Sequence, residues 1–238
     1  MSATTVIASY NTHGGVGLDR RYAPQRIADV LAELGADIVA LQELKAHDAG
    51  LDMLALLGDA TGYHAIAGPT LRLADGHFGN GLLSRYPIVS TQRIALAVGQ
   101  REPRGAIDAV IDCDGTHLRV IATHLGLARG ERREQIARLL DAIRGGPALP
   151  TVLLGDLNEW MLRGRALHEL HAHFDEAPAC ATFPSVLPVL ALDRIWMAPA
   201  QRLRRVRAHR SRLARIASDH LPLLAEIHWE SVDADIAA

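Results

Sequence analysis

The sequence predicts an α/β protein in which parallel strands are joined by covering helices. Two observations predict this class. A buried strand, an amphipathic helix and a second buried strand follow one another twice, over about residues 4–43 and 118–156. Each unit implies two neighbouring parallel strands with a helix on one face. Each strand of the two units also ends in a polar residue, and such residues gather at one end of the sheets, where α/β proteins place their sites.

Length and composition predict one globular domain over residues 1–238. Hydrophobic residues make up 49% of the chain, which is enough for a sizeable core. The net charge is −2 and the pI is near 6.6, which argues against a protein whose whole surface binds polyanions. The two cysteines form no Cys-x-x-Cys pair, which excludes a zinc knuckle or redox motif and favours a reducing compartment.

The first residues resemble a strand and not a signal peptide, because they lack a basic region and a long apolar run. No stretch approaches 18 uninterrupted apolar residues, so no transmembrane segment is expected. We therefore expect a cytoplasmic protein.

The first unit begins with a strand over residues 4–10, rich in Val and Ile, that ends at Asn11. Pro24 opens a helix and Gly35 ends it. The apolar side chains between them follow the i, i+3, i+4, i+7 spacing of one buried face: Ile27, Val30, Leu31 and Leu34. A buried strand over 37–41 follows and ends at Gln42 and Glu43.

The middle of the chain predicts a helix over 50–60 and strands over 62–67, 79–84 and 88–97. Residues 105–112 and 117–123 indicate a hairpin, with Asp114-Gly115 as its turn.

The second unit starts with a strand over 118–123 that ends at His124. Its helix has one apolar face and closes at Gly145-Gly146, and a strand over 151–154 leads to Asp156 and Asn158. A short helix over 164–172, a strand over 190–197 with Asp193 inside it, a basic strand over 203–209 and a final strand over 221–229 complete the expected elements.

Four acids interrupt or end apolar runs: Glu43, Asp156, Asp193 and Asp219. Taken singly, each could be a strand-terminal acid that caps a loop. Together at one end of the sheets they would repel one another unless a divalent cation or hydrogen-bond donors offset them. Oxygen ligands without cysteine favour Mg²⁺, and Mn²⁺ would also fit. Neutral amides that can orient anionic oxygens are available at Asn11, Asn80 and Asn158.

Other hydrolytic and nucleotide motifs are absent from the sequence. It has no His-Glu-x-x-His, no Gly-x-Ser-x-Gly and no Gly-x-x-x-x-Gly-Lys-[Ser/Thr]. His124 and His220 are the candidates for proton transfer. His13 and His77 are expected in loops at the same end of the sheets.

The ordered set of motifs resembles the endonuclease/exonuclease/phosphatase superfamily, which includes pancreatic deoxyribonuclease. The motifs span residues 11–222, nearly the whole chain: Ser-Tyr-Asn11, Leu-Gln-Glu43, Gly-Asn80-Gly-Leu-Leu-Ser-Arg, Thr-His124-Leu, Gly-Asp156-Leu-Asn158, Leu-Asp193-Arg-Ile and Ser-Asp219-His220-Leu-Pro. The resemblance implies a four-layer α/β/β/α sandwich with two pseudo-symmetric halves.

The resemblance also implies a role for each motif residue. Glu43 would be the principal metal ligand, with Asn11 and Asp219 near the ion. Asp156 would position the attacking water or a second metal ion. Asn158 and His124 would hold the scissile phosphate. Asp193 would orient His220, which would act as general base or stabilise developing charge.

The expected activity is metal-dependent hydrolysis of a phosphodiester or phosphomonoester. The compact chain resembles small bacterial members, some associated with phospholipid metabolism, which suggests a lipid-like or small phosphodiester. The alternative is a Mg²⁺-dependent nuclease acting on DNA or RNA. A non-catalytic binding module ranks below both, because every motif acid and histidine is present.

Two sequence features bear on that choice. The basic segment 202–212 is either a charged edge strand or a rim that attracts nucleic acid or an anionic membrane surface. Aromatic residues make up only 4% of the chain, which predicts no base-stacking platform. Arg104 is either a substrate-phosphate ligand or a structural arginine.

Overall fold

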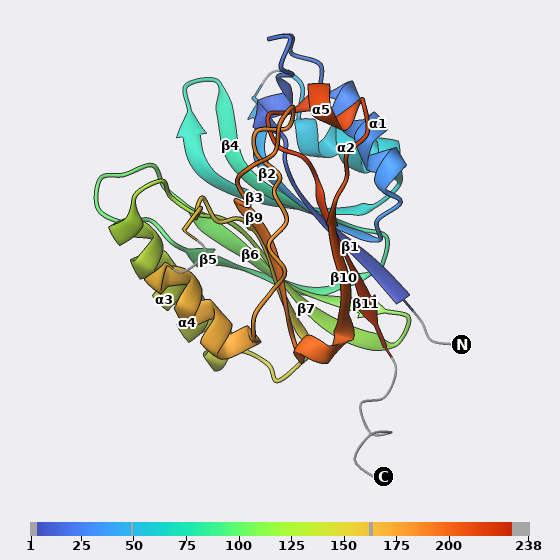
Figure 1. The fold of residues 1–238 in the computed structure, drawn as a ribbon. Helices are drawn as coiled ribbons and strands as arrows, with labels where there is room; N and C mark the ends of the chain where they lie inside the picture. The colour runs from blue at the N-terminus through green and yellow to red at the C-terminus, as the bar shows by residue number, and fades with distance from the viewer. Residues whose placement is uncertain (1–3, 49, 162–163, 230–238) are drawn as a thin grey trace.

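The computed structural model describes residues 4–48, 50–161 and 164–229. Two mixed sheets face one another, and helices cover the outer face of each, so that the order of layers is α/β/β/α (Figure 1). The four-layer sandwich expected from the motifs is therefore confirmed.

The first sheet has six strands in the order β10-β11-β1-β2-β4-β3. Its strands are β1 (Thr4–Asn11), β2 (Ile38–His47), β3 (His64–Leu73), β4 (Gly76–Ser84), β10 (Leu203–Ala208) and β11 (Leu223–His228). The helices on its outer face are α1 (Gln25–Leu34), α2 (Met53–Thr61) and α5 (Ala214–Ala217), as Figure 1 shows. A 3₁₀ turn, η1 (His13–Gly15), follows β1.

The second sheet has five strands in the order β5-β6-β7-β8-β9. They are β5 (Ile88–Ala95), β6 (Gly105–Cys113), β7 (Thr116–His124), β8 (Thr151–Asp156) and β9 (Asp193–Ala198). Its outer helices are α3 (Arg129–Gly145) and α4 (Arg165–Phe174), and a second 3₁₀ turn, η2 (Ala200–Arg202), follows β9.

The repeated strand–helix–strand unit is confirmed in both halves. β1 pairs in parallel with β2 across α1, and β7 pairs in parallel with β8 across α3. The other neighbouring strands are antiparallel. The carboxyl ends of β1, β2, β7 and β8 therefore point to one end of the sandwich.

Strand alternation divides the apolar side chains into three layers. On β1, Ile7 faces the space between the sheets, whereas Ala8 and Tyr10 face the helices. On β8, Val152 and Leu154 face the other sheet and Leu153 faces α3 and α4. A polar residue that continues the inward face of a strand is consequently held between the two sheets, at their end.

Several strand limits differ from the sequence-based expectation. β2 does not stop at Glu43 but continues to His47, because β4 begins at Gly76 and pairs with the extension. β3 likewise runs to Leu73. β9 begins at Asp193, since Leu190 forms only an isolated bridge with Phe183. Asp193 thus opens its strand and does not interrupt it.

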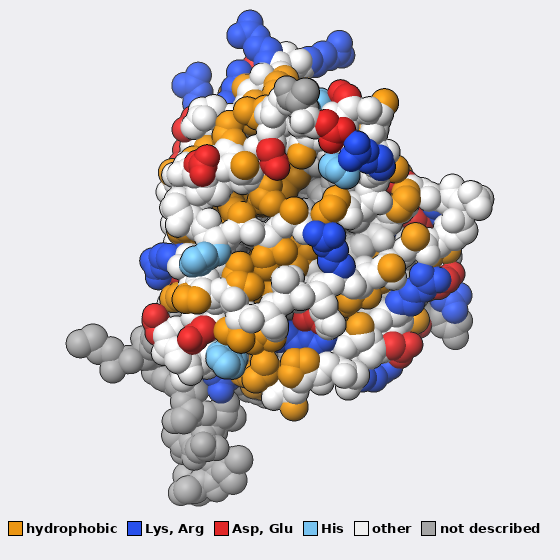
Figure 2. Space-filling view, turned by 180° about the vertical axis from the view of Figure 1, so that it is seen from behind, with side chains coloured by type: hydrophobic (Ala, Val, Ile, Leu, Met, Phe, Trp, Pro, Cys, Tyr) orange, Lys and Arg blue, Asp and Glu red, His pale blue; other side chains and the backbone are white. Residues whose placement is uncertain are grey.

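Residues 203–208 of the basic segment form β10, which lies at the edge of the six-stranded sheet. This agrees with one of the two interpretations of the segment, a charged edge strand. No helix in the described part of the chain is long and apolar enough to span a bilayer. On the face opposite that of Figure 1, hydrophobic side chains are exposed in a band down the middle, with charged groups mostly around it (Figure 2).

Candidate active site

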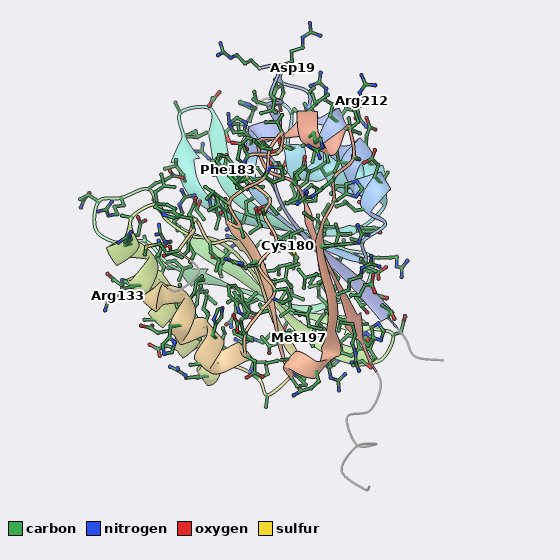
Figure 3. The ribbon with its side chains drawn as sticks, viewed as in Figure 1. Asp19, Arg133, Cys180, Phe183, Met197 and Arg212 are labelled. Carbon is green, nitrogen blue, oxygen red and sulfur yellow. The ribbon has the colours of Figure 1, made fainter. Side chains whose placement is uncertain are left out.

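Polar residues from both sheets meet at the end of the sandwich where the parallel strands finish. Asn11 ends β1, His124 ends β7 and Asp156 ends β8. β9 runs antiparallel to β8 and starts there, with Asp193 opposite Asp156. Each of these residues continues the inward-facing set of its strand, so their side chains converge between the sheets. Met197, near the other end of β9, lies at the opposite end of the sandwich from Phe183 of the site (Figure 3).

Glu43 reaches the site through an irregularity of β2. Alternation from Val39 and Leu41 would place it on the helix side. The register with β4 shifts between Leu41 and Leu44, and Glu43 has a φ of +59°. Such a bulge redirects a side chain, and a left-handed non-glycine residue stores strain that is common at functional sites. The carboxylate consequently accepts a hydrogen bond from Asn11 Nδ2 at 3.0 Å.

The Ser-Asp-His loop before β11 is tied to the end of β1. Ser218 donates from Oγ to the Asn11 carbonyl at 2.7 Å and accepts from the His220 N–H at 3.3 Å. These bonds fix Asp219 and His220 beside Asn11, although more than 200 residues separate them in the chain.

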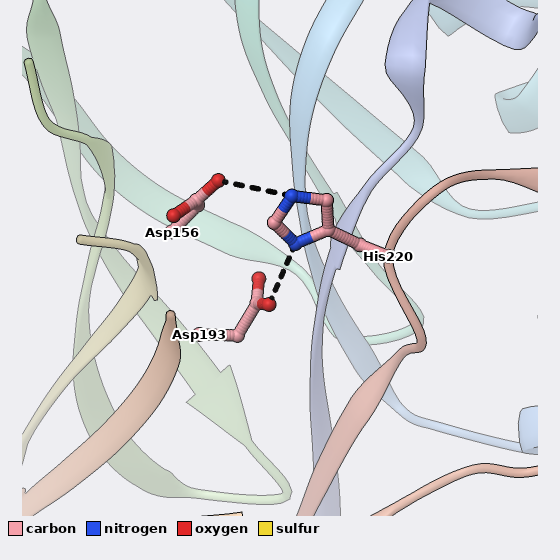
Figure 4. Close-up of side chains that lie close together, drawn as sticks. All are labelled: Asp156, Asp193 and His220. Carbon is pink, nitrogen blue, oxygen red and sulfur yellow. Dashed lines mark hydrogen bonds and ion pairs between the residues drawn. The ribbon is translucent and has the colours of Figure 1, made fainter. Parts of the chain in front are cut away.

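His220 forms a buried pair with Asp193, as the motifs suggested (Figure 4). Its Nδ1 lies 2.9 Å from Asp193 Oδ2, and its Nε2 lies 3.6 Å from Asp156 Oδ2. Burial lowers the pKa of His220, but the charge and hydrogen bond of Asp193, with Asp156 and Asp219, outweigh it and raise the pKa to about 10. The imidazole is therefore a cation at neutral pH.

Asp193 is itself held by a residue that the motifs did not identify. Thr182 Oγ1 donates to Asp193 Oδ2 at 2.5 Å, and both side chains are fully buried. This second bond fixes the carboxylate that orients His220.

The Asn11 amide joins two carboxylates, and the charge of a third, Asp219, acts on one of them. Asn11 Nδ2 donates to Glu43 and also to Asp156 Oδ2 at 3.0 Å. Burial, together with the charges of Asp219 and Asp156, raises the pKa of Glu43 against the Asn11 hydrogen bond. The negative charge of these carboxylates is not balanced within the cluster, and a divalent cation would relieve this imbalance. Carboxylate and amide oxygens are also the ligands that such a cation prefers.

Asp156, Asp193 and His220 also bring one potential ligand atom each within 4.8 Å of one another. His220 is nonetheless a poor metal ligand here, because its Nδ1 is bonded to Asp193 and its raised pKa favours a protonated ring, which has no free lone pair. This trio is better suited to handling a proton than to holding an ion.

The Nε2 atom of His124 also lies 3.6 Å from Asp156 Oδ2, but this histidine has the opposite charge preference to His220. Burial lowers its pKa to about 4; Asp156 opposes the shift, and Arg104 and His220 add to it. Arg104 Nη1 lies 3.1 Å from its Nδ1, and Asn158 Nδ2 lies 3.0 Å from its Nε2. Arg104 is buried, its Nε has no hydrogen-bond partner among the described residues, and Nη1 also pairs with Glu102 at 3.3 Å. A neutral imidazole, an arginine and an amide thus form one group suited to anionic oxygens.

Asn80 takes a different position from the other predicted residues. It is buried on β4 and donates from Nδ2 to the Gly105 carbonyl at 3.0 Å. It therefore holds the start of β6, next to Arg104, and lines a smaller neighbouring cavity that His77 also lines. His13 lies at the site, with Nδ1 4.0 Å from Asp219 Oδ1, whereas His77 Nε2 contacts Arg72.

A cavity of about 700 Å³ opens over these groups. Its polar lining includes Glu43, Lys45, Glu102, Arg104, His124, Asp156, Asn158, Asp219 and His220. Its apolar lining is Leu71, Leu73, Phe78, Leu127, Trp160, Phe183, Leu190 and Leu192. Three aromatic rings line this one cavity, so the low aromatic content did not exclude a stacking surface at the site.

A buried ion pair supports the loop that carries Asn158. Arg132 of α3 donates from Nη2 to Glu159 Oε2 at 3.0 Å, and its Nη1 donates to the Leu127 carbonyl at 2.5 Å. Its guanidinium also lies 5.3 Å from the centre of the Trp160 ring. The charged Glu-Arg-Arg-Glu-Gln run was visible in the sequence, but nothing local indicated which arginine would be buried.

Comparisons with known proteins agree with this geometry. The Endonuclease/Exonuclease/phosphatase family matches residues 8–220. The chain belongs to this family. The "Uncharacterized protein YbhP" of Escherichia coli K12 is 31% identical over 242 residues, covering 93% of this chain and 95% of the relative.

Solved structures show the same fold at low sequence identity. An endonuclease/exonuclease/phosphatase from Beutenbergia cavernae superposes with a TM-score of 0.78 at 22% identity, over 96% of this chain and 72% of that one. The Bacteroides thetaiotaomicron mannosyl-6-phosphatase Bt3783 gives a TM-score of 0.75 at 19% identity, over 93% of this chain and 98% of that one. Members of the family are hydrolases that act on phosphate esters.

Proposed function

We propose that the protein is a divalent-metal-dependent phosphoesterase that hydrolyses phosphodiester or phosphomonoester bonds by attack of water. One observation carries the proposal: a cluster of three carboxylates, His220 with its buried partner Asp193, and an Arg104–His124–Asn158 group meet at one cavity. The first can hold a cation, the second can handle a proton and the third can hold phosphoryl oxygens.

Glu43, Asn11, Asp219 and Asp156 would hold Mg²⁺ or Mn²⁺. Burial and, to a smaller extent, the charges of Asp219 and Asp156 raise the pKa of Glu43, and a bound cation would offset both effects, which supports this assignment. When bound, the ion would polarise a phosphoryl oxygen and neutralise charge that develops on it.

The residues of the chain then divide the remaining work. Arg104 and Asn158 donate to non-bridging oxygens of the phosphate, and neutral His124 lies between them. Asp156 is aligned by the Asn11 amide and by the Asn158 N–H, which donates to its Oδ1 at 2.9 Å, so it can accept a hydrogen bond from the attacking water. Protonated His220 would stabilise negative charge on the phosphoryl group or give its proton to the leaving oxygen.

The cavity walls favour a substrate with an apolar part. Leu71, Leu73 and Phe78 of the β3–β4 hairpin and Phe183 of the loop before β9 face the polar floor. A phosphate ester bearing an acyl, alkyl or aromatic group would bury apolar area there while the floor binds its phosphate. A lipid-like or small phosphodiester is therefore the favoured substrate class.

The test is hydrolysis of bis(p-nitrophenyl) phosphate and p-nitrophenyl phosphate with Mg²⁺, Mn²⁺ or EDTA. We expect metal-dependent turnover, its loss in Glu43→Gln and His220→Ala, and retention of it in the control Glu226→Gln on β11. Calorimetric titration of Mg²⁺ should show binding that Glu43→Gln weakens. Absence of turnover on both esters with either metal would refute the proposal.

A nuclease is the second candidate, and the aromatic lining of the cavity favours it. Trp160, Phe78 and Phe183 could stack on bases. The arginines of segment 202–212, by contrast, are not among the residues that line the cavity. Incubating plasmid, single-stranded DNA and RNA with Mg²⁺ separates the two: intact nucleic acid beside active ester hydrolysis would exclude the nuclease.

A further inference from the structure

A second group of buried polar side chains lies on the other face of β9. Asp193, Ile195 and Met197 point between the sheets, so Arg194 and Trp196 point towards the helix layer. Arg194 is 2% exposed and Trp196 is 1% exposed. Side chains two positions apart on a strand face the same way, roughly 7 Å apart.

Both side chains have donors without an acceptor. Nε and Nη2 of Arg194 and Nε1 of Trp196 are buried and have no hydrogen-bond partner among the described residues. None of the ion pairs among the described residues includes Arg194. A buried unpaired guanidinium and indole N–H destabilise a fold unless a ligand or water accepts from them.

A cleft lies against Arg194. It has a volume of about 360 Å³ and is lined by Arg194, by Leu167 and His171 of α4, and by residues 176–179. The His171 and Trp196 ring centres are 6.0 Å apart. Glu176 is exposed at the rim and opposes an anion there, while the aliphatic lining shields the guanidinium from solvent.

We propose that this cleft binds a small oxyanion, a phosphate or carboxylate group, with Arg194 as its principal ligand. The site is separate from the cavity over Asp156 and lies behind the strand that carries Asp193. A guanidinium is always charged and offers a fork of donors that matches such anions. The oxygens of such an anion would accept from the Arg194 donors that have no partner among the described residues.

The three tryptophans allow one experiment to report on both sites. The Trp196 ring lies 6.0 Å, centre to centre, from the ring of His171, which lines the proposed cleft. Trp160 lines the active-site cavity, and Trp229 donates to Thr5 Oγ1 at 2.7 Å, away from both. Metal-free ¹⁵N-labelled protein is titrated with inorganic phosphate and, separately, with acetate, and the indole N–H signals are followed by NMR. We expect a saturable shift of the Trp196 signal in at least one arm, with Trp229 unchanged.

Variants decide whether Arg194 is responsible. Arg194→Met should weaken the Trp196 response by about ten-fold or more, Arg194→Lys should keep part of it, and the control Arg205→Met on β10 should behave as wild type. In anion-free buffer Arg194→Met should melt at the same temperature as wild type or higher, because it removes an unpaired buried charge.

Three results would overturn the proposal: no Trp196 shift with either anion, an undiminished shift in Arg194→Met, or a markedly lower melting temperature of that variant without anion. The response of Trp160 and the ester-hydrolysis assay report on the proposed function independently, so the two proposals can fail separately.

Discussion

The side chains of Asn11 and Asp156 form a 3.0 Å hydrogen bond that joins the two sheets of the sandwich at the site. The two residues are 145 positions apart and end β1 and β8 respectively. Because the same amide nitrogen also donates to Glu43, it fixes carboxylates from both sheets relative to one another.

Replacing Asn11 with Ala should leave both carboxylates without this donor. We expect the free energy of unfolding to fall by about 1–3 kcal/mol, and Mg²⁺ binding and turnover to weaken. Urea unfolding and calorimetry measure these effects. As a control, Thr61→Ala removes hydroxyl bonds to helix carbonyls of α2, far from the cavity, and should alter stability only slightly and Mg²⁺ binding not at all.

The raised pKa of His220 makes stability depend on pH. Its folded-state pKa of about 10 exceeds the ordinary value of 6.5. The stabilisation is therefore fully present below pH 6.5 and is lost as the pH rises through about 10. In metal-free wild type, the free energy of unfolding should fall over this range by roughly 1.4 kcal/mol for each unit of pKa shift.

Asp193→Asn removes the main source of that shift. Its unfolding free energy should be nearly flat between pH 6.5 and 10, and the pH above which turnover declines should move towards neutrality. The unfolding free energy of His220→Asn should also change little between pH 6.5 and 10. An unchanged pH profile in Asp193→Asn would show that the pair does not set the charge of His220.

Removing one partner of the buried Arg132–Glu159 pair should destabilise the fold more than replacing both partners. Arg132→Met leaves Glu159 buried and unpaired, and we expect a loss of about 3–5 kcal/mol in unfolding free energy. The double variant Arg132→Met/Glu159→Met should recover much of it, yet turn over more slowly because the Asn158 loop loses its anchor. Arg138→Ala, which breaks an exposed pair with Glu134 on the same helix, should cost less than about 0.5 kcal/mol.

Gly155 should tolerate no side chain. It precedes Asp156 with a φ of +150°, and a Cβ there would lie 1.9 Å from the Thr123 carbonyl oxygen of β7. Gly155→Ala should separate β7 from β8 and lower the free energy of unfolding by more than about 3 kcal/mol. Gly145→Ala, at the end of α3 with open space around it, should be neutral or stabilising. Equal stability of the two variants would contradict this view of the β7–β8 contact.

The fold could be predicted because its two halves repeat a local pattern. Period-2 alternation on β1 and β8 and the apolar faces of α1 and α3 are short-range features, so the layers followed from them. Whether residues 1–238 form one domain stays a prediction. The ends of β2 and β9 were missed because they depend on pairing: β2 continues only because Gly76 starts a partner strand, and Asp193 opens β9 only opposite Asp156.

The site was predictable where a polar residue ended an apolar strand, as at Asn11 and His124. It was not predictable where a contact depends on tertiary packing. Thr182 supports Asp193, and Arg132 supports the loop after β8, yet neither stands out among its neighbours in sequence. The bulge at Glu43 likewise has no local signature, since a left-handed glutamate is imposed by the surrounding sheet.

The position of β11 has a consequence for the newly made chain. It is the last strand among the described residues, yet it lies between β10 and β1, and the loop that enters it carries Asp219 and His220. A chain still emerging from the ribosome already holds Glu43, His124, Asp156 and Asp193 but lacks Asp219 and His220. Under the proposed function, hydrolysis requires β11 to pair with β1, so a partial chain that ends before β11 would not hydrolyse phosphate esters.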